Sequence, residues 1–249
     1  MSSAVNEEIH QIWATRKSLE GCQDLRSTPR GANAPRSPES PVVWPPLHEE
    51  LKDYLHLFTG QVLNAGCGHR DLASHVPGQV TNQDIPGGLH NAGVHILAPL
   101  HDIPRPAGTF DAVVCNAVLE HVRNPGDVLQ EFRRVLRDGG LLYLAVPFLQ
   151  PEHLDPTDFQ RYTKDGLCDL VERHGFAVVS VAGVHSVYHT LAWIVHEWLS
   201  SSNCWSYRVL RRVLYPLLRW KTRTSKVYVD RIASVYRVLA RKKSESVNQ

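Results

Sequence analysis

The sequence predicts an α/β protein in which a mostly parallel sheet is covered by helices on both faces. From Gln61 onward, apolar runs of strand length alternate with segments whose apolar residues recur at helical spacing. Strands that alternate with helices in this way are typical of parallel sheets, because the helices supply the crossover connections. With 249 residues, of which 43% are hydrophobic and 21% are charged, the chain can form one substantial core plus an accessory element.

The strands are predicted from short runs rich in apolar and β-branched residues. A helix is expected before the first strand, over residues 47–58, with its leucines on one side. The predicted strands are residues 61–66, 79–85, 93–97, 110–117, 140–147, 176–184 and 234–242.

Two helices between these strands carry start and stop signals. In the clearer one, residues 124–140, Asn124 is suited to cap the N-terminus, Pro125 suits the first helical position, and Gly139-Gly140 is expected to stop the helix. The segment 164–175 repeats this design, with Gly175 as its terminator.

The two ends of the chain depart from the alternating pattern. A short amphipathic helix is expected over residues 5–20, followed by an extended linker rich in Pro, Ser and Gly over residues 27–46. The expected parts are residues 1–46 as helix and linker, 47–184 with 228–243 as the α/β core, and 185–227 as a helical insertion.

The insertion is aromatic, apolar and basic. Residues 189–199 are apolar but too short to span a bilayer. Residues 205–220 are strongly amphipathic, and Pro216 is expected to kink this helix.

Charge is distributed unevenly, although the formal net charge is only +2. No acidic residue occurs from Trp198 to Val229, whereas this stretch holds seven basic residues. The asymmetry points to an anionic partner, such as a membrane surface contacted through residues 205–226 or a phosphate-bearing substrate. A solvated basic face and a cap over the site of the chemistry are the alternatives.

The spacing of the cysteines and the N-terminal sequence indicate the cellular compartment. The five cysteines are scattered without any C-x-x-C pair, so neither a zinc site nor a disulfide framework is indicated. The first residues contain two glutamates and no long apolar run, unlike a secretory signal. We therefore expect a cytoplasmic protein, with peripheral membrane contact left open.

The stretch VLNAGCGHRD, residues 62–71, is the first candidate binding element. Gly66 and Gly68 follow a buried strand, where glycines permit close approach to the backbone and a following helix start would attract polar groups. The third glycine of a dinucleotide fingerprint is missing, and no phosphate-binding P-loop motif is present. Asp84, at the tip of the next strand, could accept both hydroxyls of a ribose. A plain tight turn and a turn-capping carboxylate are the structural alternatives.

Three motifs, in this order and spacing, resemble class I S-adenosylmethionine-dependent methyltransferases of the type 11-like group. They are VLNAGCG, the second-strand Asp84, and DIPRPAGTFDAVVCNAVLEHV followed by PGDVLQEFRRVLRDGGLLYLAVP. The resemblance covers residues 47–184 and the last strand, and is strongest to members associated with quinones, glycans and natural products. It implies a Rossmann-like three-layer α/β/α fold with an antiparallel last strand, and S-adenosyl-L-methionine as cofactor.

The resemblance also implies a set of cofactor-binding positions. Gly66 and Gly68 would lie under the methionine part, Asp84 would bind the ribose, and the backbone of Asn116 would meet the methionyl group. The full set of implied positions is Asn64, Gly66, Gly68, Asp84, Leu100, Asp102, Asn116 and His121.

Three positions depart from the family pattern. Asn64 replaces the usual Asp, Arg70 replaces the usual last glycine, and Pro99 stands where an adenine-binding Asp is common. Asp102 lies three residues further on, so the adenine contact is expected from it or from backbone amides near Leu100.

The segment after the fifth strand, PFLQPEHLDPTDFQRYT, is expected to face the acceptor. His153 is the candidate general base, because its ordinary pKa lies near neutrality, and Asp155 is the second catalytic candidate. Asp158 and Arg161 are the candidate acceptor contacts, and capping of proline-rich turns is the structural alternative.

The predicted activity is transfer of a methyl group to an O or N atom of a small-molecule, glycan or lipid-linked acceptor. The alternative is a catalytically silent S-adenosylmethionine-fold protein with a binding or scaffold role, which would explain all three departures. Nucleic acid is disfavoured as a partner, because the fourth strand ends in CNAVLEH and no ladder of stacking aromatics accompanies the basic residues. The acceptor itself and the oligomeric state are left open.

Overall fold

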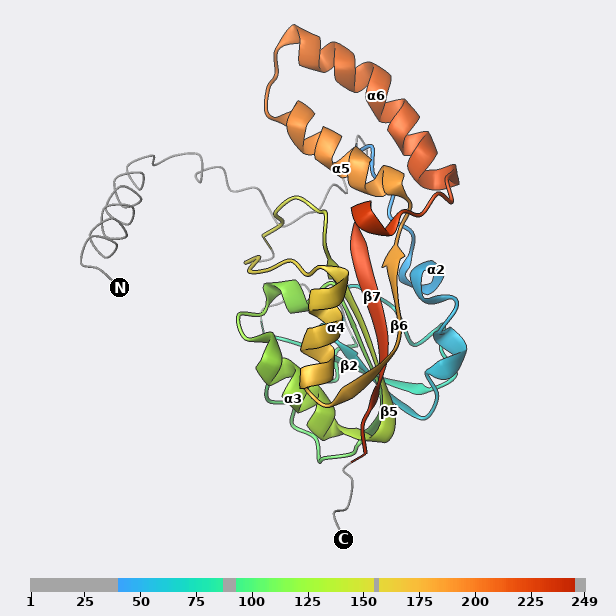
Figure 1. Cartoon of the computed structure of the whole chain (residues 1–249), viewed down its shortest axis with the longest axis vertical. Coiled ribbons are helices and arrows are strands. Elements are labelled where there is room, and N and C mark those ends of the chain that lie inside the picture. The colour runs from blue at the N-terminus through green and yellow to red at the C-terminus, as the bar shows by residue number, and fades with distance from the viewer. Residues whose placement is uncertain (1–39, 87–92, 155–156, 245–249) are drawn as a thin grey trace, which may run out of the picture. The chain divides into compact units, whose positions relative to one another are not determined.

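The computed structural model describes residues 40–86, 93–154 and 157–244 (Figure 1). The helix expected over residues 5–20, most of the expected linker, and Asp155 lie outside the described residues.

Seven strands form one mixed sheet in the order β3-β2-β1-β4-β5-β7-β6. The first five strands are parallel, whereas β7 lies between β5 and β6 and is antiparallel to both. The predicted Rossmann-like fold with an antiparallel last strand is confirmed. The strands are β1 (Gln61–Ala65), β2 (Gln79–Asp84), β3 (Ile96–Leu97), β4 (Phe110–Asn116), β5 (Leu136–Pro147), β6 (Phe176–Val184) and β7 (Val235–Lys242).

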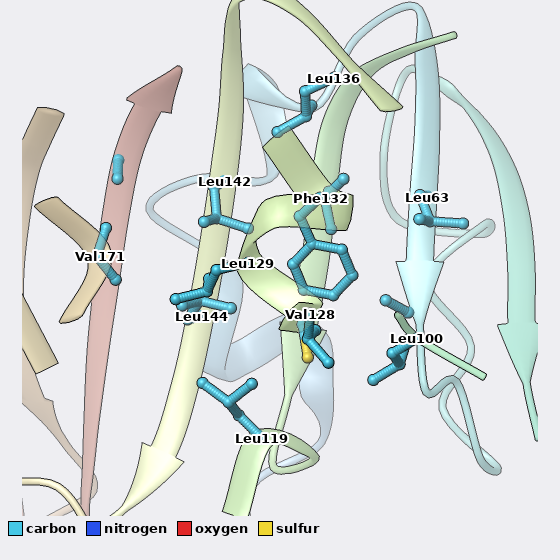
Figure 2. Close-up of a cluster of buried hydrophobic side chains, with 14 of the residues drawn as sticks. Leu63, Leu100, Leu119, Val128, Leu129, Phe132, Leu136, Leu142, Leu144 and Val171 are labelled. Atoms are coloured by element: carbon cyan, nitrogen blue, oxygen red, sulfur yellow. The ribbon is translucent and has the colours of Figure 1, made fainter. Parts of the chain in front are cut away.

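The central strands alternate their side chains between two buried faces. On β5, Leu142 and Leu144 belong to a core cluster completed by the helices α3 (Pro125–Val135) and α4 (Lys164–Arg173). Figure 2 shows Phe132 of α3 lying among the strand residues of this cluster. Tyr143 belongs to the opposite cluster, so strands buried on both faces make the three layers.

Helix α3 begins as predicted but ends earlier. Asn124 occupies the N-cap position, yet its side chain makes no capping hydrogen bond. The helix stops at Val135 because Leu136 already pairs with Phe110 of β4. The prediction that Gly139-Gly140 stops the helix is therefore wrong, since strand pairing takes over before the glycines are reached.

The second face is covered by less helix than the sequence predicted. The expected helix over 47–58 consists of one turn, α2 (Leu47–Leu51), and a 3₁₀ turn, η2 (Leu55–Leu57). Residues 66–78, between β1 and β2, form turns, so the helix start expected after the glycine loop is absent. Leu72 from these turns and Phe58 are fully buried in its place.

Two helices, α5 (Val187–Ser200) and α6 (Trp205–Thr224), follow β6 and pack against each other beyond the sheet (Figure 1). Arg211 of α6 ties the turn between them, because its guanidinium donates to the carbonyl of Leu199 at 2.8 Å and to that of Ser202. Helix α6 continues through Pro216. Within the described ranges, no helix reaches the length and hydropathy needed to cross a bilayer.

Candidate functional site

The glycine loop after β1 presents its backbone at the carboxyl edge of the sheet. Gly66 and Gly68 have φ values of +62° and +51°, where a side chain would be strained. A Cβ on Gly66 would overlap Val118, whereas one on Gly68 would meet nothing within 4 Å. The backbone of Gly68 therefore borders open space, as a loop that cradles a cofactor requires.

Asp84 and the loop are brought together as their spacing suggested. The amide of Gly68 donates to Asp84 Oδ2 at 2.9 Å, and the amide of Ile85 donates to Oδ1 at 2.8 Å. The carboxylate thus lies at the tip of β2, immediately beside the open room above Gly68.

Gln83 is a supporting residue that sequence reasoning missed. It is fully buried, accepts a hydrogen bond from the amide of Gly66 at 3.0 Å, and donates to the carbonyl of Ala98. It links the glycine loop to the segment that leads to Leu100. The signal was available, because a polar residue before Asp84 on a buried strand requires partners.

The other predicted cofactor residues divide into buried and exposed. Asn64 is buried and donates to Asn82 Oδ1 at 3.0 Å and to the carbonyl of Arg70 at 3.3 Å, so it supports the loop from below. Leu100 is buried in the core, whereas Asp102 is exposed and its amide bonds to the carbonyl of Pro99.

At the end of β4, Asn116 connects two regions of the edge. Its carbonyl accepts a hydrogen bond from Arg70 Nη1, and its side chain donates to Glu50 Oε2 at 3.2 Å. The next residue, Ala117, has a φ of +53°. A non-glycine residue in this region stores backbone strain, which is frequent at functional sites.

Glu50 and His185 form a partly buried pair that the sequence did not reveal. Glu50 Oε1 lies 2.9 Å from His185 Nε2, and His185 Nδ1 lies 3.5 Å from the Ser234 hydroxyl. Burial raises the pKa of Glu50, but hydrogen bonds from His185 and Asn116 outweigh it, and the pKa lies below its ordinary value. His185 has a φ of +70°, so the pair is held in a strained conformation.

Aromatic rings pack in a row beside this pair. The ring of Trp44 lies 4.8 Å from that of His185 and 5.4 Å from that of Trp193, measured between centroids. His153 lies 5.6 Å from Trp193 on the other side. Side chains from the segment before α2, the residue after β6, helix α5 and the segment after β5 thus converge.

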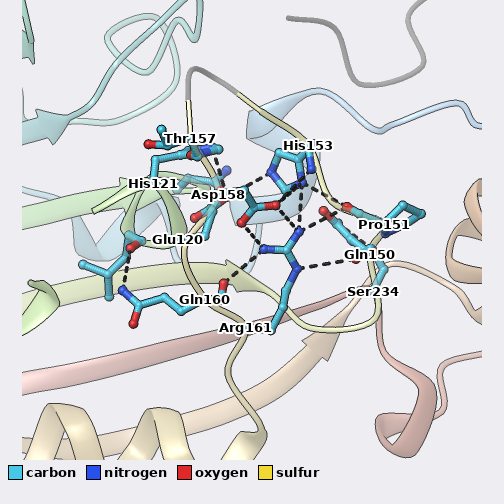
Figure 3. A network of polar contacts seen from close by, with 12 residues as sticks. Glu120, His121, Gln150, Pro151, His153, Thr157, Asp158, Gln160, Arg161 and Ser234 are labelled. Atoms are coloured by element: carbon cyan, nitrogen blue, oxygen red, sulfur yellow. Dashed lines mark hydrogen bonds and ion pairs between the residues drawn. The ribbon is translucent and has the colours of Figure 1, made fainter. Parts of the chain in front are cut away.

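Arg161 organises the segment after β5 (Figure 3). Its guanidinium makes a bidentate pair with Asp158 and donates to the carbonyl of Pro151. The amide of His153 donates to Asp158 Oδ2 at 2.9 Å. The three predicted residues His153, Asp158 and Arg161 are therefore in mutual contact.

The pKa values of this network follow from its charges. Burial raises the pKa of Asp158, but Arg161 and the amide of His153 outweigh it, and the pKa is lowered. Burial lowers the pKa of His153, but Glu120 and Asp158 outweigh it, and the pKa is raised. The base role of His153 stays a prediction, since both carboxylates favour its protonated form.

His121 faces the segment after β5. Its Nδ1 lies 2.5 Å from the carbonyl of Thr157, and its Nε2 lies 3.7 Å from Glu120 Oε1. Glu120 is fully buried and also lies 3.5 Å from His153 Nε2.

Comparison with known proteins decides the family. A family model described as a methyltransferase domain matches residues 43–181, more than half of the chain. The chain belongs to this methyltransferase family. Its cofactor is S-adenosyl-L-methionine, the donor implied by the motifs at the carboxyl edge and by the names of related proteins.

Two curated methyltransferases are similar over part of their length. The human "Thiol S-methyltransferase TMT1B" is 40% identical over 83 residues, which are 29% of this chain and 33% of that protein. The "Probable S-adenosylmethionine-dependent methyltransferase Rv3030" of Mycobacterium tuberculosis (strain ATCC 25618 / H37Rv) is 30% identical over 142 residues, covering 49% of this chain and 51% of that protein. The chain thus spans between a third and half of these relatives.

The methyltransferase fold is also that of a solved [4+2]-cyclase, SpnF. That structure gives a TM-score of 0.52 at 17% identity and covers 78% of this chain and 79% of the cyclase. This likeness concerns the fold alone, because one fold hosts different reactions.

Proposed function

We propose that this chain is an S-adenosylmethionine-dependent methyltransferase that methylates an O or N atom of a small-molecule, glycan or lipid-linked acceptor. One observation carries the proposal. The glycine loop with Asp84 and the partly buried Glu50–His185 pair meet at the same edge of the sheet, joined through Asn116 and Arg70.

The loop side of this edge suits the cofactor. The open room at Gly68 would accept the methionine part, and Asp84, at the tip of β2, would accept the ribose hydroxyls. Arg70, in the loop after β1, reaches Asn116 at the end of β4 with its guanidinium and would add positive charge next to the cofactor's carboxylate. The departures Asn64 and Arg70 have defined contacts, which favours a retuned cofactor site.

The Glu50–His185 side suits proton transfer. When bound, S-adenosylmethionine supplies an electrophilic methyl group on a positively charged sulfur. The acceptor's O or N atom forms the new bond to carbon and must release a proton. Glu50 orients the imidazole through Nε2, so His185 Nδ1 is the atom that takes this proton, as in other carboxylate–imidazole pairs.

The α5–α6 region favours a lipid-linked acceptor among these classes. Five large apolar side chains of α6 are exposed at intervals of three or four residues, which places them on one face: Trp205, Val209, Val213, Leu217 and Trp220. Arg208, Arg212 and Arg219 lie beside that face at helical spacing. Tryptophan and leucine flanked by arginine are typical of helices that lie in the interface of an anionic membrane.

Calorimetry with the purified chain tests the cofactor assignment. We expect S-adenosylmethionine and S-adenosylhomocysteine to bind with one site per chain, and Asp84→Ala to weaken both. Binding that Asp84→Ala leaves unchanged would contradict the ribose assignment, and no heat at hundreds of micromolar would favour the scaffold alternative.

An acceptor panel read by mass tests the reaction. We expect a product heavier by one methyl group with an O- or N-acceptor, and lipid-linked hydroxyl compounds rank first in the panel. A thiol belongs in the same panel, because one relative is named a thiol S-methyltransferase. Methylation of the thiol alone would contradict the proposed acceptor atom.

Vesicle flotation tests membrane contact. We expect the chain to float with anionic vesicles and not with neutral ones, and Val213→Glu with Trp220→Glu to abolish flotation. Val179→Glu is the matched control, because Val179 is similarly exposed but lies on β6. Equal loss in the control would contradict a specific docking face.

A further inference from the structure

We infer that Glu120, His121 and His153 form a binding site for a divalent transition-metal ion, of which Zn²⁺ is the best match. One potential ligand atom from each side chain lies within 4.8 Å of the other two. This site is distinct from the room above Gly68, and the inference does not depend on the proposed methyl transfer.

The Glu120 carboxylate is the observation that requires an explanation. The residue is fully buried, and neither of its oxygens has a hydrogen-bond partner among the described residues. A buried carboxylate without hydrogen bonds is strongly destabilising, so native proteins pair such a group closely with a cation. The hydroxyl of Tyr162 is also buried and has no hydrogen-bond partner in the part of the chain that the structure describes, and burial together with the charge of Glu120 raises its pKa.

The two imidazoles are arranged as metal ligands are. His121 Nδ1 must donate to the carbonyl of Thr157, because a carbonyl only accepts, and this leaves the lone pair of Nε2 directed toward Glu120. Backbone carbonyls fix the tautomer of metal-binding histidines in the same manner.

His153 differs from His121 in this respect, because its Nδ1 has both an acceptor, the carbonyl of Pro151, and a donor, the guanidinium of Arg161, as neighbours. Its Nδ1 contacts the carbonyl of Pro151 at 3.3 Å and Asp158 Oδ2 at 3.5 Å, with Arg161 Nη2 at 3.2 Å. Its Nε2 is the atom that faces Glu120.

The separations fit a metal better than a direct hydrogen bond. Nε2 of His153 and of His121 lie 3.5 and 3.7 Å from Glu120 Oε1, longer than an N–H···O hydrogen bond. Two ligands bound to Zn²⁺ in a tetrahedron lie about 3.4 Å apart, given metal–ligand bonds of about 2.0–2.1 Å. Two imidazoles and one carboxylate are ligands that Zn²⁺ accepts, and they leave one position for water.

The ion would join two parts of the chain. Glu120 and His121 belong to the 3₁₀ turn η3 (Leu119–His121), whereas His153 follows β5. The same parts are already linked by hydrogen bonds from Phe159 to the carbonyl of Glu120 and from Gln160 to that of Val122. We therefore expect the metal to hold the segment after β5 against η3.

The test is titration of the chelator-treated full-length chain with Zn²⁺, followed by calorimetry, and with Co²⁺, followed by its visible absorption. We expect one ion per chain, a tetrahedral Co²⁺ spectrum, and a rise in melting temperature on Zn²⁺ addition. Glu120→Gln and His153→Gln should each lower the affinity at least tenfold.

A matched control separates this site from adventitious binding by surface histidines. His48 and His75 stack with ring centroids 4.3 Å apart and are the obvious competing pair. His75→Gln should leave the stoichiometry and affinity unchanged. The inference is overturned if the wild-type chain shows no saturable binding, or if His75→Gln abolishes binding while Glu120→Gln does not. Cofactor binding measured by calorimetry in chelator is independent of either result.

Discussion

Two glutamate–histidine pairs near the carboxyl edge of the sheet have the same chemistry but different geometry. Glu50 and His185 are 2.9 Å apart, and Asn116 adds a second hydrogen bond to the carboxylate. Glu120 and His153 are 3.5 Å apart, and the carboxylate has no hydrogen bond among the described residues. The carboxylate of the first pair has two hydrogen bonds and the pair suits proton transfer, whereas the carboxylate of the second pair lies beyond hydrogen-bonding distance of two imidazoles.

The largest expected effect is on turnover, and it distinguishes His185 from His153 as the general base. His185→Gln should lower turnover by roughly 100- to 10,000-fold, because a well-placed base contributes about that factor. The affinity for S-adenosylmethionine should stay within about threefold of wild type, and His174→Gln on α4 serves as control. If His153→Gln lowers turnover more than His185→Gln does, the base is His153, and the roles of the two pairs are reversed.

Stability should change in opposite directions when each glutamate is neutralised. Glu50→Gln removes a carboxylate that has two hydrogen-bonding partners, and should lower the free energy of unfolding by about 2–3 kcal/mol. Glu120→Gln removes an unpartnered buried charge, and in chelator should leave stability unchanged or higher.

Urea unfolding of both variants, with and without Zn²⁺, measures this contrast. In Zn²⁺ the wild type should become more stable than Glu120→Gln, because only the wild type gains stability from the ion. Destabilisation by Glu120→Gln in chelator would show that the second pair is an ordinary ion pair.

His189, next to the first pair, makes the protein sensitive to mild acid. Burial lowers its pKa to about 4 from 6.5, with the charge of His185 acting in the same direction and hydrogen bonds to the carbonyls of Val43 and Ser186 opposing it. His189 is therefore protonated below about pH 6.5 in the unfolded chain, but only below about pH 4 in the folded chain. The free energy of unfolding falls as the pH falls through this window, because the unfolded chain binds the extra proton. The loss is about 2 kcal/mol at pH 5.

The pH dependence of unfolding in His189→Gln checks this expectation. The variant should lose about 2 kcal/mol less than wild type between pH 7 and pH 5. Identical slopes would show that His189 is protonated in the folded chain.

The smallest expected effect is on the free energy of unfolding, and it compares the N-cap residues of α4 and α3. Thr163 caps α4 by accepting a hydrogen bond from the amide of Gly166 at 3.2 Å, so Thr163→Ala should cost about 1 kcal/mol. Asn124 makes no such bond at the start of α3, and Asn124→Ala should cost a few tenths of that. Thermal unfolding of both variants gives the comparison, and equal losses would mean that Asn124 caps its helix in solution.

The fold was predictable because its signals are local. Apolar periodicity identified all seven strands, and residues 164–175 were predicted as a helix with Gly175 as its terminator. The end of α3 was not, because pairing of Leu136 with Phe110 depends on a strand that lies elsewhere in the sequence. Likewise, no local pattern showed that α2 would be a single turn.

The site was predictable only where strand ends determine it. Gly68 and Asp84 follow neighbouring parallel strands, so their contact could be anticipated. Glu50 and His185 are 135 residues apart in sequence, and their pairing results from packing of α2 against the end of β6. Cysteine spacing indicated no zinc site, whereas the proposed metal ligands are histidine and glutamate, which give no spacing motif.

The two left-handed residues, Ala117 and His185, bear on how far this protein can be made more heat-resistant. Strain of this kind costs about 1–3 kcal/mol at each position, so Ala117→Gly offers a simple gain in thermostability. Ala117 also fixes the direction in which Asn116 presents its carbonyl and its amide. Relaxing this turn would raise the melting temperature but lower activity, because stabilised enzymes often lose the strained geometry on which their reaction depends.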